Sequence, residues 1–512
     1  MSQAASPLQS IEARLRLLLP ANLYAAAWVD PSPTTLESVF NHLRTLQRIL
    51  YDYSSRRIAE RLPTPGKIDQ EWQKGTLMFT DLAGFTKLME ANASEGQAGA
   101  AALLKVLNSY FAKMIEIIST SGGDLMEFTG DALFAFFPED TRKKDTVQAV
   151  KAGLRMQRAM SHFAEIDTPH GHLHLGMRVG IHTGRFLAAD IGTPRRMEHV
   201  LLGTAVQQAK LSESKGQQGR VCLSEKAVER VKDQFRFEDG EPGYKFVIDD
   251  FTDDQLDEYE IMPRRRLASS VLLGRSTEKL MEEIEGSLNS IEPLASYIPA
   301  PVLNLLVESA DKRHIPPDFP EPTIVFVNFI GLPELVDLAL PGQETKVVNS
   351  FSRAFALINA AVEARGGVLK KVTYHLFGSD IVIYFGVPTA HTNDPARAVE
   401  AALEIREIVK AVKPPTVGGV TPEIYCQIGI SKGPCFVAEI GEPRGRREFN
   451  VLSDTVNTTA RLMNRAERNQ ILIAGRVYDE VAAHFACESL GEVSLKGKSA
   501  PTPIFEVVGY KN

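Results

Sequence analysis

Residues 77–90 read LMFTDLAGFTKLME, and a related stretch, IVFVNFIGLPELVD, occupies residues 324–337. In the first copy a short apolar run typical of a buried strand ends at Asp81, and Gly84 then opens a segment with helical spacing. The second copy has Asn328 where the first has Asp81. Because one copy has lost its carboxylate, the duplicated unit predicts two similar domains that share a single active centre.

Three further pairs of segments extend the repeat. They are SGGDLMEFTGDALFAFFP (121–138) with RGGVLKKVTYHLFGSDIVIYFGVP (365–388), MRVGIHTGRFLAADIG (177–192) with CQIGISKGPCFVAEIG (426–441), and EHVLLGTAVQQAKL (198–211) with EFNVLSDTVNTTARLM (448–463). Each copy reads as strand, helix, hairpin, helix, strand, which is the order of a ferredoxin-like α+β domain. The repeat therefore predicts two domains of one fold.

Four parts are expected along the chain. They are a helical N-terminal extension over residues 1–70, a first domain over 71–263, a linker over 264–320 and a second domain over 321–512. The linker is assigned from a basic run, one amphipathic helix and a proline-rich end.

The composition is that of a soluble globular protein, with 44% apolar and 24% charged residues. With 57 basic and 64 acidic residues, the net charge of −7 gives no indication of a nucleic-acid or anionic membrane partner. The four scattered cysteines are typical of reduced thiols in a cytosolic protein. Neither a signal peptide nor an apolar run of the ~20 residues that span a membrane is recognisable, so we expect a cytoplasmic protein without a membrane anchor.

Two carboxylates of the first repeat form a candidate metal site. Asp81 leaves the first strand and Asp131 follows the hairpin turn, so the two meet at one edge of the sheet if the hairpin pairs beside that strand. Taken alone, Asp81 is better explained as a helix N-cap and Asp131 as a turn residue. Their joint replacement in the second copy, by Asn328 and Ser379, favours a metal site. Two oxygen ligands beside a glycine turn suit Mg²⁺.

The turn after Asp81 is a candidate phosphate-binding element. The backbone N–H groups of Gly84, Phe85 and Thr86 would lie at a helix N-terminus. Such N–H groups point outward and favour anions. A polyphosphate substrate therefore fits beside the predicted metal site.

Four of these motifs together resemble the class III nucleotidyl cyclases: FTDLAGFT, the GGD…FTGDALFAFF segment, MRVGIHTG and NVLSDTVNTTARLM. The resemblance covers residues 76–262 and 321–510, and the tandem arrangement is most similar to the soluble, bicarbonate-responsive adenylyl cyclases. It implies two domains packed head to tail as an intramolecular pseudo-dimer, and hence a monomer, with each potential active site lying across the interface.

The resemblance also implies a division of labour. The first domain would hold two Mg²⁺ ions, or Mn²⁺, through Asp81, Asp131 and the carbonyl of Leu82. The second would supply Asn457 to orient the ribose and Arg461 to stabilise charge on the phosphorus. These two are spaced i and i+4 on a predicted helix and so share one face, although a solvated helix face gives the same spacing.

The reaction implied is attack by the ribose 3′-oxygen on the α-phosphate of ATP, with release of pyrophosphate. One metal ion would lower the pKa of the 3′-hydroxyl and the other would bridge the phosphates. Arg178 and Lys496 match further phosphate-binding positions of the family. An exposed surface cation is the alternative interpretation of both.

The choice of base rests on Lys371. A lysine suits the N1 acceptor of adenine, whereas a carboxylate suits the N1 donor of guanine, and Glu127 in the first copy matches Lys371 in the second. Because the metal site takes its base pocket from the other domain, Lys371 would read the base and ATP is expected. Asn450, at the partner position, can accept from the adenine amine or donate to guanine O6. A guanylyl cyclase and a catalytically silent nucleotide- or anion-binding module remain the alternatives.

A mirror-related site would be built from the remaining members of the repeat, namely Asn328, Ser379, Glu127, Gln207 and Lys210. It lacks the carboxylate pair, although Asp380 would supply one carboxylate if the hairpin register slipped by one residue. We predict that it does not turn over nucleotide. In the bicarbonate-responsive cyclases a lysine and an arginine hold the anion there. Glu127 and Lys210 stand in their place and are expected to neutralise each other as an ion pair, so bicarbonate activation should be weak or absent.

Overall fold

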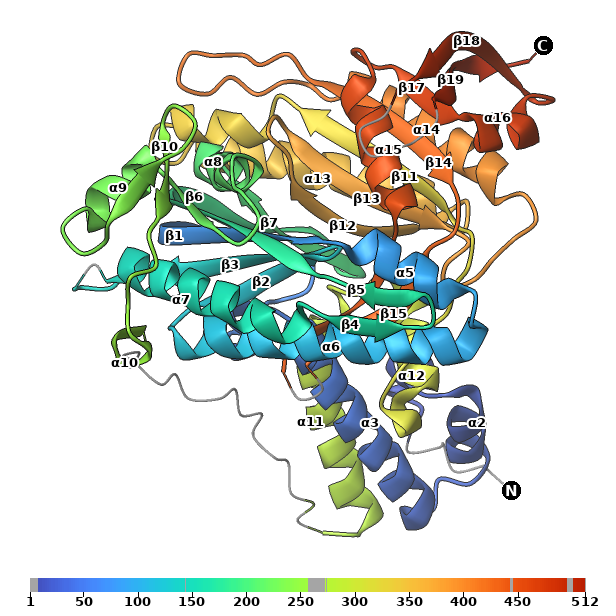
Figure 1. Cartoon of the computed structure of the whole chain (residues 1–512). Coiled ribbons are helices and arrows are strands. Elements are labelled where there is room, and N and C mark those ends of the chain that lie inside the picture. The colour runs from blue at the N-terminus through green and yellow to red at the C-terminus, as the bar shows by residue number, and fades with distance from the viewer. Residues whose placement is uncertain are drawn as a thin grey trace, which may run out of the picture.

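The computed structural model describes residues 8–142, 144–256, 272, 274–442, 445–494 and 501–511. Two mixed β-sheets with their covering helices form the body of the molecule, and a group of helices lies below them (Figure 1). The predicted pair of ferredoxin-like α+β domains is confirmed. The boundaries at residues 70, 263 and 320 stay predictions.

The first sheet has the order β2-β3-β1-β6-β8-β10-β9, with β7 paired to β6. Its core strands are β1 (Asp69–Ala83), β2 (Asp124–Thr129), β3 (Ala132–Pro138), β6 (Gly176–Thr193), β7 (Arg196–Leu202), β8 (Val221–Ser224), β9 (Phe237–Asp239) and β10 (Tyr244–Val247). The hairpin β2–β3 pairs beside β1, as the position of Asp81 and Asp131 required. A small ribbon of β4 (Ile166–Thr168) and β5 (Gly171–Leu173) stands apart.

The second sheet repeats this order as β12-β13-β11-β14-β17-β19-β18. Its strands are β11 (Thr323–Ile330), β12 (Val368–Tyr374), β13 (Ser379–Phe385), β14 (Tyr425–Lys432), β17 (Ile471–Ala474), β18 (Phe485–Val493) and β19 (Thr502–Tyr510). The counterpart of the long strand β6 is divided here. Its first part is β14, and its second part forms a separate hairpin, β15 (Phe436–Gly441) with β16 (Arg447–Leu452).

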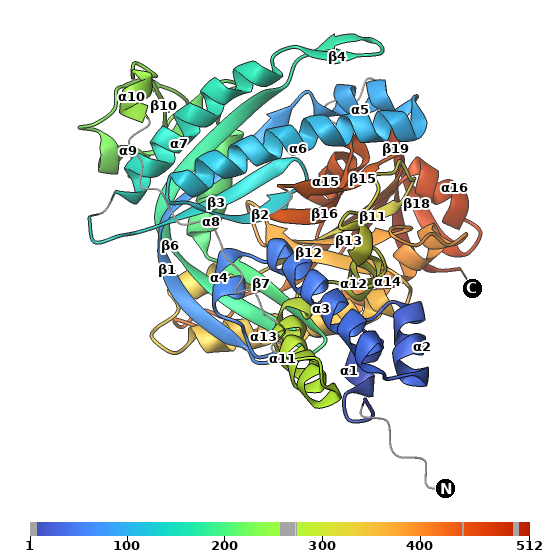
Figure 2. The same cartoon turned by 90° about the horizontal axis from the view of Figure 1, so that it is seen from below.

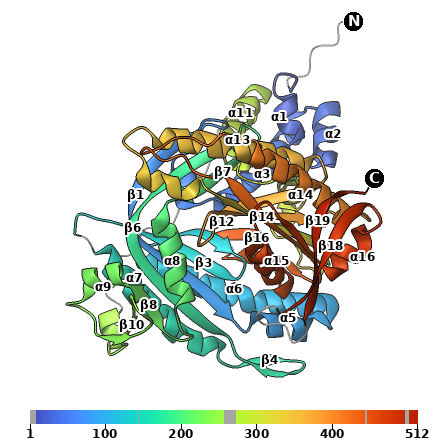
Figure 3. The same cartoon turned by 90° about the horizontal axis from the view of Figure 1, so that it is seen from above.

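Helices cover both sheets. In the first domain they are α5 (Phe85–Ala93), α6 (Gly96–Thr120), α7 (Asp145–Ala159), α8 (Thr204–Ser214), α9 (Glu225–Val231) and α10 (Asp253–Leu256). In the second they are α13 (Glu344–Glu363), α14 (Asp394–Lys410), α15 (Asp454–Arg465) and α16 (Gly475–Val481). Viewed from above, α8 lies over the first sheet and α15 over the second (Figure 3). Where the first domain has α5, the second has a 3-10 helix, η3 (Pro333–Leu338), which begins at a proline.

The two domains contact each other reciprocally. Helix α6 of the first domain packs on β15 of the second, and its counterpart α13 packs on β6 of the first. Alternate residues of β15, Phe436, Ala438 and Ile440, belong to the apolar core of the first domain. This reciprocal packing is the head-to-tail pseudo-dimer that the sequence predicts.

A helical module lies against the second domain. It consists of α1 (Glu12–Arg16), α2 (Ala21–Val29), α3 (Pro33–Tyr53) and α4 (Arg56–Glu60), together with α11 (Thr277–Ala295) and α12 (Ala300–Glu308). Helices α3 and α11 lie side by side (Figures 1 and 2). The segment predicted as a linker therefore contains two helices, α11 and α12, which pack on the N-terminal extension.

The hairpin β15–β16 joins this module to the two sheet-containing domains. Val437, Phe449 and Val451 share one apolar cluster with α3 and α11, on the side of the hairpin opposite the first domain. A buried polar contact reinforces the junction, because the Tyr53 hydroxyl donates to Glu439 at 2.5 Å and Arg447 donates to the same carboxylate at 2.8 Å. The hairpin is thus enclosed on both faces.

Candidate active site

A cavity of about 310 Å³ lies between the two domains. Residues predicted from different repeats meet in its wall: Asp81, Phe85 and Asp131 from the first domain, and Lys371, Asn450 and Asn457 from the second. Since these residues are separated by hundreds of positions in the sequence, their convergence is a product of the head-to-tail packing. It places candidate metal ligands and candidate base-recognition groups around one space.

Strand pairing brings the two carboxylates together. On one side of β1, Asp81 lies opposite Arg178 of β6. On the other side Thr80 pairs with Leu133 of β3, so Asp131, in the turn just before β3, lies next to the end of β1. Gly130 permits this tight turn with a left-handed φ of 64°. Burial and the charge of Asp81 raise the pKa of Asp131 to about 8.

The carboxylate pair fits a divalent cation. Burial and the neighbouring Asp81 both disfavour ionisation of Asp131, and a bound cation would offset both effects. No group of three or more His, Cys, Asp or Glu side chains suited to a metal ion occurs among the described residues. A cation here would therefore take further ligands from backbone carbonyls such as that of Leu82, from water and from a bound phosphate.

Asp81 does not cap the following helix. The N-cap of α5 is Gly84, whose φ of 95° is left-handed, and no side chain accepts a hydrogen bond at this cap. A Cβ atom at Gly84 would lie 2.4 Å from the carbonyl oxygen of His174, so only glycine fits. Phe85 is buried and lines the cavity, and Thr86 follows it in the first turn of α5.

Arg178 lies beside the carboxylates. It forms an ion pair with Asp81 and a second with Glu213 at 3.0 Å. Lys210 pairs with the same Glu213 at 2.6 Å. The predicted ion pair between Glu127 and Lys210 is therefore wrong, because the partner of Lys210 is a glutamate on its own helix.

Helix α15 carries Asn457 and Arg461. It begins at a serine cap, where the Ser453 hydroxyl accepts from the N–H of Val456 at 3.2 Å. Asn457 is exposed to the cavity, and Arg461 follows one turn later, outside the residues that line it. The ion pair of Arg461 with Asp454 is long, at 3.8 Å, and within the described chain its buried Nη1 has no hydrogen-bond partner. Among the described residues Nη1 of Arg461 is thus left without a hydrogen bond, and the structure does not place it in the wall of the cavity.

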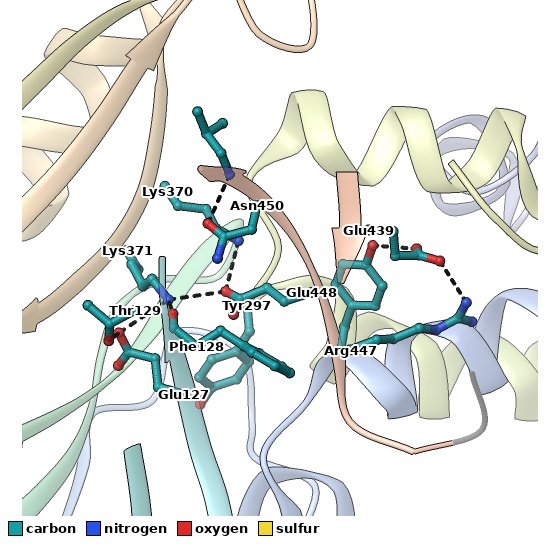
Figure 4. Close-up of polar contacts among 12 residues, drawn as sticks. Glu127, Phe128, Thr129, Tyr297, Lys370, Lys371, Glu439, Arg447, Glu448 and Asn450 are labelled. Carbon is teal, nitrogen blue, oxygen red and sulfur yellow. Dashed lines mark hydrogen bonds and ion pairs between the residues drawn. The ribbon is translucent and has the colours of Figure 1, made fainter. Parts of the chain in front are cut away.

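The base-recognition candidates are held by cross-domain contacts (Figure 4). The Lys371 ammonium donates to the carbonyl of Phe128 and lies 3.2 Å from Glu127 and 3.5 Å from Glu448. Burial lowers the pKa of Lys371, but the charges of the two glutamates more than offset this and raise it above its ordinary value. The Asn450 amide donates to the carbonyl of Gly130 at 3.1 Å.

Two of the mirror-related residues are hydrogen-bonded to side chains outside the set. Asn328 donates to Gln427 at 3.1 Å and Gln207 donates to Glu334 at 2.7 Å. In the second sheet Asn328 pairs with Asp380. In the first sheet the last pair between β1 and β3 is Thr80 with Leu133, so the next positions opposite each other are Asp81 and Ala132. Asp380 therefore stands in the place of Ala132 and Ser379 in that of Asp131, so the register has not slipped.

Asp380 should make the stability of the protein depend on pH. Burial raises its pKa to about 7, and its Oδ1 has no partner within the described residues. Between pH 4 and 7 the unfolded chain ionises this carboxyl while the native state keeps it protonated, so stability falls as the pH rises and levels off above pH 7. Asp380→Asn should thus be more stable than the wild type by on the order of 3 kcal/mol at pH 8, and equal to it near pH 4. Urea unfolding at both pH values measures this difference, and an equal gain at both would contradict it.

Other predictions have simpler outcomes. Lys496 lies outside the described residues. The four cysteines are unpaired. In the described part of the chain, no helix has both the length and the apolar character needed to cross a membrane.

Sequence reasoning missed Glu448 and Tyr374. Glu448 pairs with Lys370 at 2.8 Å and Tyr374 donates to Glu127 at 2.9 Å, both at the domain interface. A signal for Glu448 was present, because the first repeat has Glu198 at the same place in its motif. Nothing comparable marks Tyr374.

Comparisons with known proteins place the chain among the cyclases. The mouse (Mus musculus) adenylate cyclase type 10 is 24% identical over 490 residues, which cover 90% of this chain and 28% of the relative, so the chain spans less than a third of that protein's length. The terminal-differentiation specific adenylate cyclase of Dictyostelium discoideum is 32% identical over 158 residues, covering 30% of this chain and 7% of the relative.

A solved structure also spans both domains. It is the class III adenylyl cyclase-like ATP-binding protein from Pseudomonas aeruginosa, with 15% identity, a TM-score of 0.55 and coverage of 86% of this chain and 92% of that one. This likeness concerns the fold. The family model of the adenylate and guanylate cyclase catalytic domain matches twice, over residues 68–244 and 317–506. The chain therefore belongs to the adenylate and guanylate cyclase catalytic domain family and contains two copies of that domain.

Proposed function

We propose that the protein is an adenylyl cyclase that converts ATP to 3′,5′-cyclic AMP and pyrophosphate at one site between its domains. The observation that carries the proposal is the shared cavity, in which Asp81 and Asp131 of one domain face Lys371 and Asn457 of the other. The names of the mouse and Dictyostelium relatives support the same activity. The replacement of both carboxylates in the second domain supports a single catalytic site.

The residues divide the chemistry between them. Two Mg²⁺ or Mn²⁺ ions held by Asp81, Asp131 and the Leu82 carbonyl would supply Lewis acidity at the ribose 3′-hydroxyl and the phosphates. Asn457 orients the ribose so that its 3′-oxygen faces the α-phosphate. Arg461 stabilises the charge that develops on the phosphoryl oxygens.

Further groups hold the triphosphate and the base. The N–H groups of Gly84, Phe85 and Thr86, at the start of α5, receive the phosphates, and Arg178 and Lys496 add positive charge. Lys371 donates to adenine N1, and Asn450 accepts from the adenine amine. Both halves of the site are in one chain, so a monomer can form the active site. The proposal further places the protein in the cytoplasm, without a nucleic-acid or membrane partner.

Product formation from ATP and GTP, measured side by side with Mg²⁺ and with Mn²⁺, tests the proposal. We expect cyclic AMP from ATP and much slower formation of cyclic GMP. Lys371→Glu should reduce turnover of ATP by about 100-fold and lower the ratio of ATP to GTP turnover, because a carboxylate cannot donate to adenine N1.

Other results would identify the alternatives. Faster turnover of GTP would identify a guanylyl cyclase. If neither nucleotide is cyclised and Asp81→Ala leaves ATP binding unchanged, the chain is instead a silent nucleotide-binding module.

A further inference from the structure

We propose that Glu127, the counterpart of Lys371 in the first domain, is a positioning residue that fixes the Lys371 ammonium for base recognition and so sets the preference for adenine. This inference rests on the proposed function, because it assumes that Lys371 reads the base. It gives a role to a residue of the mirror-related site that catalysis leaves unused.

The two residues meet because both strands are distorted in the same way. A β-bulge shifts the register of β2 between Leu125 and Glu127, and another shifts β12 between Leu369 and Lys371. A bulge re-aims the side chain that follows it. Here the two bulges bring Glu127 and Lys371 to 3.2 Å across the domain interface.

Glu127 lies behind Lys371 when seen from the active-site cavity. Lys371 lines that cavity and also a smaller one of about 90 Å³. Glu127 lines only the smaller cavity. The carboxylate is itself fixed, because Tyr374 donates to it at 2.9 Å and Thr129 at 3.2 Å. Both side chains of the pair are buried, with exposed fractions of 8% for Lys371 and 13% for Glu127.

The three contacts of the Lys371 ammonium differ in length, and this difference indicates which of them breaks when a base binds. An ammonium has three N–H donors, and Phe128, Glu127 and Glu448 receive them. The contact with Glu448 is the longest, at 3.5 Å, and Glu448 has a shorter ion pair with Lys370 at 2.8 Å. Glu448, like Glu127, lines only the smaller cavity, so a base in the active-site cavity draws the ammonium away from its weakest contact, the one with Glu448, while Glu127 keeps its contact.

Glu127 also keeps Lys371 charged. Burial lowers the pKa of this lysine, and the carboxylates of Glu127 and Glu448 counteract that effect. Without Glu127, one glutamate would face two lysines and an arginine, and the pKa of Lys371 would fall. The charged and titratable groups that line the small cavity with Lys371 lie on several elements: Glu127 on β2, Glu448 on β16, Arg446 before β16, Lys370 and Tyr374 on β12, Glu198 and His199 on β7, Tyr53 on α3, and Tyr297 after α11.

Glu127→Gln tests the role, with Glu198→Gln as its matched control. Glu198 lines the same small cavity and has the same exposed fraction of 13%, but its ion-pair partner is Arg196 at 2.7 Å. Glu127→Gln should raise the KM for ATP by about 30-fold with little change in kcat, as expected for a lost charge-assisted contact. Glu198→Gln should change this KM by less than about threefold.

A pH profile separates positioning from a general loss of packing. The protonated ammonium is the form that donates to adenine. As the pH rises, kcat/KM of Glu127→Gln should therefore begin to fall at a lower pH than that of the wild type, while Glu198→Gln should follow the wild type. Equal KM values and equal profiles for the two variants would overturn the proposal.

A charge swap adds a test of specificity. In Lys371→Glu, three carboxylates meet, whereas the double variant Glu127→Lys with Lys371→Glu restores an ion pair. The double variant should recover the stability that the single variant loses and should prefer GTP over ATP. Recovered stability with an unchanged preference for ATP would refute the role in specificity.

Failure of the proposed function would be visible separately. If the wild type forms no cyclic AMP, the proposed function fails, and binding of a non-hydrolysable ATP analogue by calorimetry still decides the role of Glu127. Weaker binding in Glu127→Gln than in Glu198→Gln supports it, and equal binding refutes it.

Discussion

Asp131→Asn should reduce cyclic AMP formation by about 1000-fold without weakening the fold. The carboxylate is one of two predicted metal ligands, and an amide oxygen carries no charge to hold a divalent cation. In the metal-free protein the pKa of Asp131 is raised, first by burial and then by the charge of the neighbouring Asp81. Replacing a carboxyl that the native state disfavours in its charged form by a neutral amide should therefore leave the free energy of unfolding equal or higher, which urea unfolding in the presence of a chelator measures.

The control for this variant lies at the other end of the same strand. Asp140 is an exposed carboxylate just beyond β3, so Asp140→Asn should retain full activity and stability. An Asp131→Asn protein that keeps more than a tenth of the wild-type rate would show that the carboxylate pair is not the metal site.

Arg461→Ala should lower kcat by about 300-fold and leave the KM for ATP nearly unchanged. Arg461 has a long ion pair with Asp454 at 3.8 Å, so its guanidinium is not committed to a strong partner in the described structure. A planar cation that meets charge only as it develops on phosphorus contributes to the transition state more than to binding. Steady-state kinetics with saturating metal ion separates the two constants.

Arg465 provides a matched substitution. It lies one turn further along α15 and is exposed, so Arg465→Ala removes the same side chain from the same helix without touching the site. Arg461→Lys should remain well below the wild type, because an ammonium lacks the planar fork. A rise in KM with an unchanged kcat for Arg461→Ala would instead assign this residue to ground-state binding.

The features that could be predicted from the sequence are those that depend on short-range patterns, such as the pairing of one hairpin or the repeat of a motif. The position of Asp131 beside Asp81 follows from one hairpin pairing beside one strand, and the apolar pattern of the repeat determines that register. The division into two like domains follows from the repeat itself. These predictions needed no knowledge of how the domains meet.

The partner of Glu127 could not be predicted in this way. Its contact with Lys371 depends on two bulges and on the angle at which the domains pack, and neither leaves a pattern in the sequence. The pair Lys210–Glu213, in contrast, has i and i+3 spacing on one helix and was predictable. The predicted Glu127–Lys210 pair was wrong because the prediction gave Lys210 a distant partner, whereas in the structure Lys210 pairs with Glu213 on its own helix.

The enclosure of the β15–β16 hairpin has a consequence for the order in which the chain folds. Helix α3 precedes both sheets in the sequence, yet its apolar side is covered by α11, which follows the first catalytic domain, and by Phe449 and Val451 near the end of the second. Closing contacts over such separations is slow compared with forming a local hairpin. During synthesis, the apolar side of α3 therefore remains exposed to water and to chaperones until the second domain is nearly complete. The part of the protein that is made first is thus among the last to reach its native packing.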